Sequence, residues 1–393
     1  MQTEKQRILQ LVSEGKIAVE EAVTLLEALE KQNTASPKTE TKVTQEKQAT
    51  TEQQEKTDEQ KTTHTENDQT REFFEEEMKN FRKDLSQVGS VFMELFNTTV
   101  KKVKDYDFNT PFSFGEKVTF QEVRTFDADD ISQVFIEMPN GSVTIEPAEL
   151  QDARLVCSVR TSLQDDEETT RAKFLEQFVA QADMGTLRVI NEMKWAVVDT
   201  TLYLPQKKYD EIKLRLTNGT ANLRELNARK VKVKTLNGAV KAHRLTFDEA
   251  KVQTANGEVE LRSVRGEELE AETVNGRVYI EGALVEVEAK SVNGTVSITN
   301  YGKKARKVEA ETVAGAVELY LPSHLALSGK LGTNLGKLDV NLADVNKVES
   351  QDQMFSKTLN FTKESENSKL YIEGSSKTGT IIVRYTTMLD TEE

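Results

Sequence analysis

The sequence predicts a mainly β protein whose C-terminal part is a β-solenoid, and three observations lead to this fold class. An Asn-Gly pair recurs about every 19 residues between 218 and 294. Apolar and polar residues alternate on both sides of each pair, which is typical of half-buried strands. The same residue types return at the same place in every repeat, as the stacked rungs of a solenoid require.

Each repeat reads apolar-x-apolar-x-Thr/Ser-x-Asn-Gly-x-Val-x-apolar. The repeat-turn residues are Asn140, Asn218, Asn237, Asn256, Asn275 and Asn293. From Asn218 onward the steps are 19, 19, 19 and 18 residues, and 21 more reach Ala314, where the pattern departs from Asn. Asn and Gly both tolerate positive φ, so we expect a tight corner at each pair.

Two architectures satisfy this pattern. In a solenoid similar to a parallel β-helix, the Asn-Gly pair is a corner of each rung, and rungs stack about 4.8 Å apart. In a meander, the pair is a type I′ hairpin turn. We favour the solenoid, because Ala and Thr before the turn suit a narrow interior and stacked Asn side chains would form a hydrogen-bonded ladder.

Before the repeats, strand-like alternation covers 134–138, 186–190 and 196–204. A helix is expected near 167–182, with one face made of Ala172, Leu175, Phe178 and Val179. A solenoid needs capped ends, and the caps are expected in 106–204 and after 325. We therefore assign 105–393 to one solenoid domain.

The first 32 residues predict a helical hairpin with a Gly-containing turn at Glu14–Lys16. Two helices this short cannot bury an adequate core, so their apolar faces are expected to bind a protein or an amphipathic peptide. The candidate partner-binding residues are Ile8, Leu11, Leu25, Leu26 and Leu29. Residues 33–70 are rich in Thr, Gln, Glu and Lys, which predicts a disordered linker.

Residues 71–104 predict an amphipathic helix with apolar residues at alternating steps of four and three. The apolar face comprises Phe74, Met78, Phe81, Leu85, Val88, Phe92 and Leu95. Three roles remain open for it: packing on the β domain, forming a short coiled-coil dimer, or peripheral contact with a membrane. A homo-oligomer is compatible with the second role.

Composition restricts the function further. The net charge of −14 argues against nucleic acid as a partner, since phosphate binding needs clustered Lys and Arg. The single cysteine, Cys157, forms no intramolecular disulfide and is expected to be buried. The absence of a signal or transmembrane pattern predicts a cytoplasmic protein.

No catalytic or metal-binding motif is evident, and we expect no enzyme activity, cofactor or metal. His64, His243 and His324 are scattered, with the latter two expected in surface loops. Parallel β-helices also include polysaccharide-cleaving enzymes with acidic clusters. Here the residues after the turns vary, running Ala239, Glu258, Arg277, Thr295 and Ala316. This variation is typical of an ordinary exposed strand.

Two segments carry a resemblance to a known family. Gln6–Ala22 and Leu25–Leu29 resemble the SHOCT-like N-terminal domain of the LiaX/YvlB-type proteins of Gram-positive bacteria. Tyr203–Tyr209, with the Asn-Gly repeats after it, resembles the β-strand-repeat "putative adhesin" domain of the same proteins. Strand repeats alone occur in many bacterial proteins, so the combination is the specific signal.

The resemblance implies a role in the cell-envelope stress response, including the response to membrane-active antimicrobial peptides. It associates the N-terminal domain with signalling or peptide binding and the β domain with regulation. It also implies that such proteins reach the cell surface without an obvious signal sequence, as an alternative to the cytoplasm. A surface adhesin or structural scaffold is the competing hypothesis.

Overall fold

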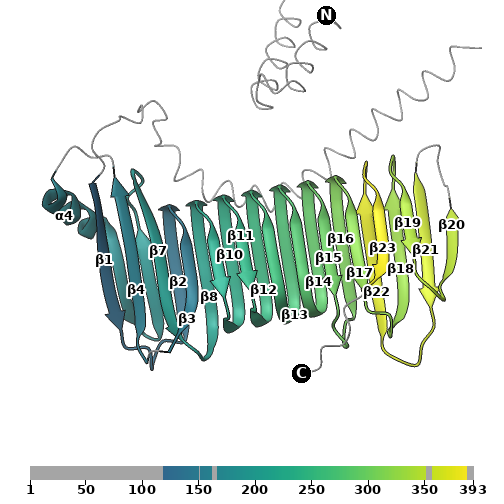
Figure 1. Ribbon diagram of the computed structural model, residues 1–393, viewed down its shortest axis with the longest axis horizontal. Helices are drawn as coiled ribbons and strands as arrows, with labels where there is room; N and C mark the ends of the chain where they lie inside the picture. Colours follow the sequence, from purple (N-terminus) through teal and green to yellow (C-terminus); the bar gives the residue numbers. More distant parts are fainter. Residues whose placement is uncertain (1–117, 150, 162–165, 351–355, 387–393) are drawn as a thin grey trace, which may run out of the picture. The chain divides into compact units, whose positions relative to one another are not determined.

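The computed structural model describes residues 118–149, 151–161, 166–350 and 356–386 (Figure 1). These residues form 23 strands and one helix, α4. The predicted hairpin, linker and amphipathic helix all lie outside the described residues. The description below therefore concerns the β domain.

The Asn-Gly repeats form a stack of rungs, each with a long strand before the turn and a second strand after it (Figure 1). The first two of these rungs are β8 (Lys208–Asn218) with β9 (Ala221–Arg224), and β10 (Asn227–Asn237) with β11 (Val240–His243). The following strands are β12 (Thr246–Asn256), β13 (Val259–Asn275), β14 (Val278–Asn293), β15 (Val296–Asn300), β16 (Lys307–Ala314) and β17 (Val317–Leu321).

The pairing confirms a solenoid and excludes the meander for these repeats. Strand β10 pairs with β8 and β12 in parallel, and Asn237 stands in register with both Asn218 and Asn256. A hairpin meander would pair neighbouring strands antiparallel. Side chains alternate inward and outward along each strand, and the inward set forms one continuous hydrophobic core.

The rung that carries Asn140 lies directly beside β8, although 78 residues separate Asn140 from Asn218. This rung consists of β2 (Gln133–Asn140) and β3 (Val143–Ala148). The chain between it and β8 builds the first end of the solenoid. The elements of that end are β4 (Ala153–Thr161), α4 (Glu167–Gln177), β5 (Phe178–Asp183), β6 (Thr186–Asn191) and β7 (Ala196–Pro205).

At the first end, β6 and β7 form one further rung that is parallel to β2 and β3. Beyond them the pairing turns antiparallel: β5 pairs with β6, β4 with β7, and β1 (Val118–Phe126) with β4. Helix α4 packs on this end through Phe174, which contacts Phe120 of β1 and Phe178 of β5. The predicted cap is therefore present in this part of the chain.

At the last end the chain passes over one rung position and returns to fill it. Strands β22 and β23 stack on β16 and β17, while β18 and β19, which precede them in sequence, lie outside them. Two antiparallel strands, β21 and β20, then extend the sheet from β18. The bounds are β18 (Ala326–Thr333), β19 (Leu338–Asn341), β20 (Asn346–Ser350), β21 (Lys357–Lys363), β22 (Lys369–Ser376) and β23 (Ile381–Tyr385).

The helix near 167–182 is present but ends earlier, and its predicted face is wrong. It stops at Gln177, and Phe178 already begins β5. Leu175 is 40% exposed and Val179 is 43% exposed, whereas Phe174 is fully buried. The segment joins a helix to a strand, so a single helical period cannot describe both halves.

Candidate functional site

The turn asparagines form a hydrogen-bonded ladder along one edge of the solenoid. The side-chain amide of each asparagine donates to the side-chain oxygen of the preceding one, at 2.8–2.9 Å, from Asn293 back to Asn140. The six members are Asn140, Asn218, Asn237, Asn256, Asn275 and Asn293. The ladder ends at Ala314, which takes the asparagine position in the next rung but has no amide.

The glycine after each asparagine is required mainly by close stacking. A Cβ atom on Gly257 would lie 2.0 Å from the carbonyl oxygen of Gly238, and no side chain fits there. Gly238 has φ of 150°, but none of the turn asparagines has positive φ. The expectation that Asn occupies that conformation is therefore wrong. Positive φ in non-glycine residues recurs instead at the corner that follows the short strand, at Glu225, Arg244 and Ser263.

A second ladder lies inside the first. Buried hydroxyl groups two residues before a turn asparagine, or before Ala314, donate to the glycine carbonyl oxygen of the preceding rung at 2.8–3.1 Å. The donors are Thr235, Thr254, Thr273, Ser291 and Thr312. These contacts satisfy hydroxyls that would otherwise be costly to bury, and they fix the register between rungs.

The outer face of the long strands carries rows of charged residues, which we call the charged face. It comprises the positions seven, five and three residues before the turn asparagine, or before Ala314, on β8, β10, β12, β13, β14 and β16. The middle row runs Lys213, Lys232, Lys251, Glu270, Glu288 and Glu309. Its sign changes once, between Lys251 and Glu270, whose side chains form an ion pair at 2.5 Å.

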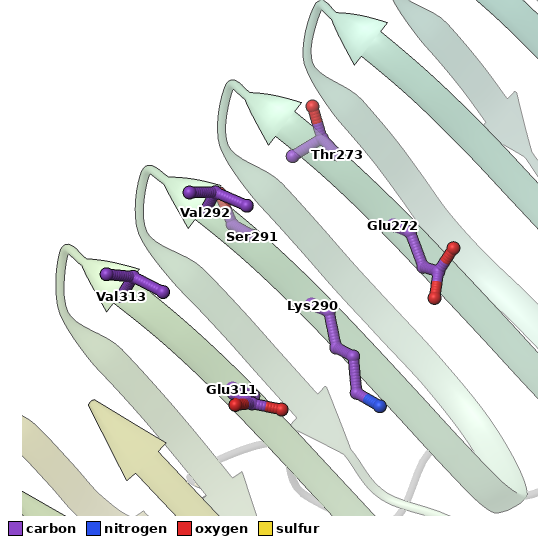
Figure 2. Close-up of a pocket in the computed structure, with 7 residues that line it drawn as sticks. All are labelled: Glu272, Thr273, Lys290, Ser291, Val292, Glu311 and Val313. Atoms are coloured by element: carbon purple, nitrogen blue, oxygen red, sulfur yellow. The ribbon is translucent and has the colours of Figure 1, made fainter. Parts of the chain in front are cut away.

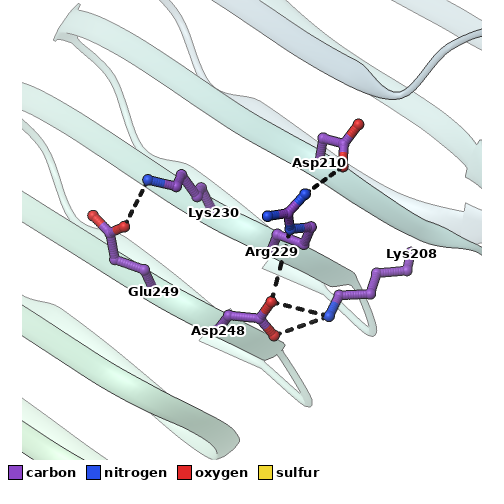
Figure 3. A network of polar contacts seen from close by, with 6 residues as sticks. All are labelled: Lys208, Asp210, Arg229, Lys230, Asp248 and Glu249. Atoms are coloured by element: carbon purple, nitrogen blue, oxygen red, sulfur yellow. Dashed lines mark hydrogen bonds and ion pairs between the residues drawn. The ribbon is translucent and has the colours of Figure 1, made fainter.

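Figure 3 shows the network at the basic end of this surface, beside the corner where the long strands begin. Asp248 accepts two contacts from Lys208, at 2.9 and 3.1 Å, which reach across the intervening strand. Arg229, between them, pairs with Asp210 at 3.5 Å and with Asp248 at 4.0 Å. These side chains are about half exposed, so each pair contributes about 0–1 kcal/mol and the network mainly orders the surface.

A small pocket lies on the acidic end, lined by side chains from β13, β14 and β16 (Figure 2). Glu272 on its wall is 9% exposed, and burial together with the neighbouring Glu270 raises its pKa. The Gln253 amide donates to Glu272 at 2.7 Å, and the Gln253 side-chain oxygen has no hydrogen-bond partner. The pocket has a volume of about 20 Å³, which is close to the space of one water molecule.

Other residues singled out in the sequence are not brought together. Cys157 is fully buried, and burial raises the pKa of its thiol to about 11, as expected for a small core residue. His243 is the exposed last residue of β11, and His324 is exposed after β17. Within the described ranges, no cluster of three or more His, Cys, Asp or Glu residues is arranged to hold a metal ion.

The candidate partner-binding residues Ile8, Leu11, Leu25, Leu26 and Leu29 lie outside the described residues. The charged face was not predicted from the sequence, because the repeats were aligned on their apolar and turn residues and the polar positions of the long strands were not compared. The sequence does contain the signal. From Asn218 onward, the residue five positions before the turn asparagine is Lys in three successive repeats and Glu in the next two, and Glu309 holds that position before Ala314. No helix in the described part of the chain is long and apolar enough to cross a membrane.

Comparison with known proteins places this chain in a family. Residues 131–384 match the Toastrack DUF4097 family, and residues 3–33 match a SHOCT-like domain. Among relatives, the uncharacterized protein YvlB of Bacillus subtilis is 36% identical over 388 residues, which is 98% of this chain and 99% of that protein.

Three solved structures each cover 68% of this chain at low similarity. A "putative cell adhesion protein" from Clostridium sporogenes is 11% identical with a TM-score of 0.26, over 100% of its chain. A "putative adhesin" from Bacteroides fragilis is 11% identical with a TM-score of 0.30, over 97% of its chain. A "Putative lipid binding protein" from Parabacteroides distasonis is 12% identical with a TM-score of 0.31, over 95% of its chain.

At these TM-scores the solved structures add no argument about function. The family match and the YvlB identity, by contrast, span most of the sequence and agree with the solenoid and with the predicted N-terminal domain. The chain therefore belongs to the Toastrack DUF4097 family, as a YvlB-like protein with a SHOCT-like domain at its N-terminus.

Proposed function

We propose that this protein is a non-enzymatic component of the cell-envelope stress response. It senses or regulates the response to membrane-active antimicrobial peptides by binding proteins or peptides. The N-terminal hairpin makes the first contact through Ile8, Leu11, Leu25, Leu26 and Leu29. The solenoid is the rigid scaffold that binds or restrains a second component.

The observation that carries the proposal is the combination of a SHOCT-like domain with a stiff solenoid whose outer face is ordered by charge. Hydrogen-bonded ladders tie every rung to the next, so the outward side chains stand at fixed spacings. Side chains held in advance lose less entropy when they bind, which favours recognition. Opposite charges at the two ends of the face favour a partner selected by electrostatic complementarity.

The small pocket beside Glu272 does not favour a catalytic role for this carboxylate. Glu272 has a raised pKa, but it faces Gln253 and Lys290 in a pocket with room for about one water molecule. Catalytic carboxylates need a substrate-sized cleft beside them, because their pKa matters only where a substrate can reach them. A reproducible polysaccharide-cleaving activity of the purified chain would contradict this part of the proposal.

The hairpin is tested by Leu26→Asp in the full chain, with binding of a fluorescent cationic amphipathic peptide as the measurement. Placing a carboxylate on an apolar contact face should weaken binding roughly tenfold or more. Val43→Asp is the matched control, since Val43 is the one large aliphatic residue in the linker 33–70. Equal affinities for the two variants would remove the hairpin as the contact.

A cellular experiment distinguishes the adhesin hypothesis from the stress-response proposal. Deletion of residues 1–70 should abolish induction of an envelope-stress reporter by such peptides if the hairpin is the sensor. Normal induction, combined with loss of adhesion when the solenoid is deleted, would favour a surface adhesin. Protease accessibility on intact cells tests the cellular location in the same strains.

A further inference from the structure

The charged face has two halves of opposite sign. On β8, β10 and β12 its nine positions hold six basic residues, two acidic residues and Gln253, for a net charge of +4. On β13, β14 and β16 the nine positions hold seven acidic and two basic residues, for a net charge of −5. Both halves have the same width of three strands and belong to one continuous sheet.

Within the middle row, like charges stand directly beside each other on adjacent strands. Lys232 is in register with Lys213 on one side and with Lys251 on the other. Glu288 is likewise in register with Glu270 and Glu309. Like charges placed directly opposite in a sheet are destabilising. Ion pairs within the copy, from Lys232 to Glu211 at 3.3 Å and from Lys290 to Glu288 at 2.5 Å, offset part of this repulsion, and an opposed surface of opposite charge would relieve the rest.

We propose that this face is an interface between two copies of the chain. The copies are related by a two-fold axis that runs parallel to the strands and passes between β12 and β13. Rotation about this axis reverses the order of the strands and preserves the position along each strand. Lys251 then faces Glu270 of the second copy, Lys232 faces its Glu288, and Lys213 faces its Glu309.

The flanking rows agree with this register. Lys230 faces Glu286 of the second copy and Arg215 faces its Glu311, while Glu211 faces Lys307. Six of the nine facing pairs attract and two repel. The ninth brings together Gln253 and Glu272, which are buried and already bonded to each other within each copy, so this position adds no charge contact. A shift by one strand in either direction places Lys251 or Glu270 opposite its own counterpart, so the charges select one register.

The area is sufficient for a concentration-dependent dimer. Six strands at about 4.8 Å spacing and six residues at about 3.3 Å rise cover about 570 Å² on each copy. The total of about 1,100 Å² lies just below the range of stable interfaces and within that of weak, transient complexes. Charged pairs contribute most of the complementarity, so association should weaken steeply with added salt.

A second copy matches both halves of the face, whereas a polyanion matches only the basic half. An anionic polymer lying along the middle row would meet repulsion beyond Lys251, where Glu270 begins. The proposal goes beyond peptide sensing by the hairpin and is tested without peptide, so each can fail alone.

The test is sedimentation of the full chain at about 0.05 M and about 0.5 M salt over a range of concentrations. The wild type should dimerise at low salt and dissociate at high salt. Lys232→Glu and Glu288→Lys should each weaken dimerisation about tenfold or more. An equimolar mixture of the two variants should restore it, because each reversed residue then faces an opposite charge. Lys241→Glu, on the opposite sheet, is the matched control and should dimerise as the wild type does.

Unchanged circular dichroism and thermal midpoints would show that the variants fold. The proposal is overturned if the full chain stays monomeric at low salt, or if both variants dimerise as tightly as the control. It is also overturned if their mixture associates no better than either variant alone. Binding of polyglutamate through Lys232 by a monomer would assign the basic half to a polyanion instead.

Discussion

Antiparallel strands extend both ends of the solenoid, but in the described residues only the first end is also covered by a helix. Phe174 of α4 contacts aromatic rings on both β1 and β5, so one side chain bridges the two sheets of the solenoid. At the last end β21 and β20 continue only one of the sheets, and β19 ends the other. Leu335 and Val348 there are 59% and 66% exposed.

The helix on the first end leads us to expect that the last end opens first. Local opening is easiest where few apolar contacts and many exposed backbone hydrogen bonds are found. A repeat protein gains stability from contacts between neighbouring rungs, so its terminal rungs depend on the quality of their caps. We therefore expect amide hydrogens in β19 and β20 to exchange before those in β1 and β5.

The largest effect should follow from Phe174→Ala, which would break this order. Phe174 is fully buried between two other rings, and its truncation leaves a cavity across both sheets. We expect a loss of about 3–5 kcal/mol in the free energy of unfolding. Denaturant titration measures the loss, and hydrogen exchange should show the first end opening before the last. Leu175→Ala, at the exposed neighbouring position, should change stability little.

An intermediate effect should follow from Gly329→Ala at the last end. A Cβ atom there would lie 2.1 Å from the ring of Phe361, which covers this glycine from β21. Displacing the ring should cost about 1–3 kcal/mol and accelerate exchange in β20 and β21. Gly332→Ala on the same strand meets no atom within 4 Å and serves as the control. If both variants behave alike, the ring contact is not what holds this end.

The smallest effect should come from lowering the pH, which should destabilise the first end and leave the last end unchanged. Asp199 of β7 accepts hydrogen bonds from the Ser142 backbone and hydroxyl at 2.9 and 2.7 Å, and it pairs with Arg160. Burial favours its neutral form, but these contacts outweigh burial and lower the pKa of Asp199. The stabilisation is therefore complete above the ordinary aspartate pKa of about 3.9 and disappears as the pH falls through the lower folded value.

Hydrogen exchange at decreasing pH measures this effect. Exchange in β3 and β7 should accelerate below about pH 4 relative to β19, after correction for the intrinsic pH dependence of exchange. Asp199→Asn should remove the difference, while Asp183→Asn, exposed on β5, should retain it. Equal acceleration at both ends in the wild type would contradict a specific role for Asp199.

The regular rungs were predictable from sequence because each rung places the same types of residue at the same positions. Val233, Val252 and Ala271 occupy equivalent positions in successive repeats, and all three are buried. The position of Asn140 beside Asn218 was not predictable, because the two residues are 78 positions apart in the sequence and only the pairing of β2 with β8 brings them together. A sequence repeat predicts contacts between residues that are one repeat apart. It does not predict contacts where the chain leaves the stack of rungs and later returns to it.

The two ends of the solenoid were harder to predict from sequence, because their residues meet requirements that occur only once and do not recur in every repeat. Asp166 caps α4 by accepting from the Thr169 amide at 2.9 Å, so the helix start follows from sequence. Its end at Gln177 depends on β5 pairing with β6, which no local pattern reveals. Among candidate site residues, the turn asparagines stand in register in successive rungs. The charged face could be recognised only from the register between strands. The partner-binding role of the hairpin stays a prediction.

The asparagine ladder also bears on the chemical lifetime of the protein. In a flexible chain, Asn-Gly is the sequence most prone to deamidation, because the glycine nitrogen attacks the side-chain amide and closes a succinimide ring. Here the Gly238 nitrogen donates to the Asn256 carbonyl oxygen at 2.9 Å, and the Asn237 side chain is bonded to rungs on both sides. These hydrogen bonds hold both the glycine nitrogen and the asparagine side-chain amide in positions that do not favour ring closure. We therefore expect the Asn-Gly pairs, which would deamidate quickly in an unfolded chain, to deamidate slowly in the stacked rungs.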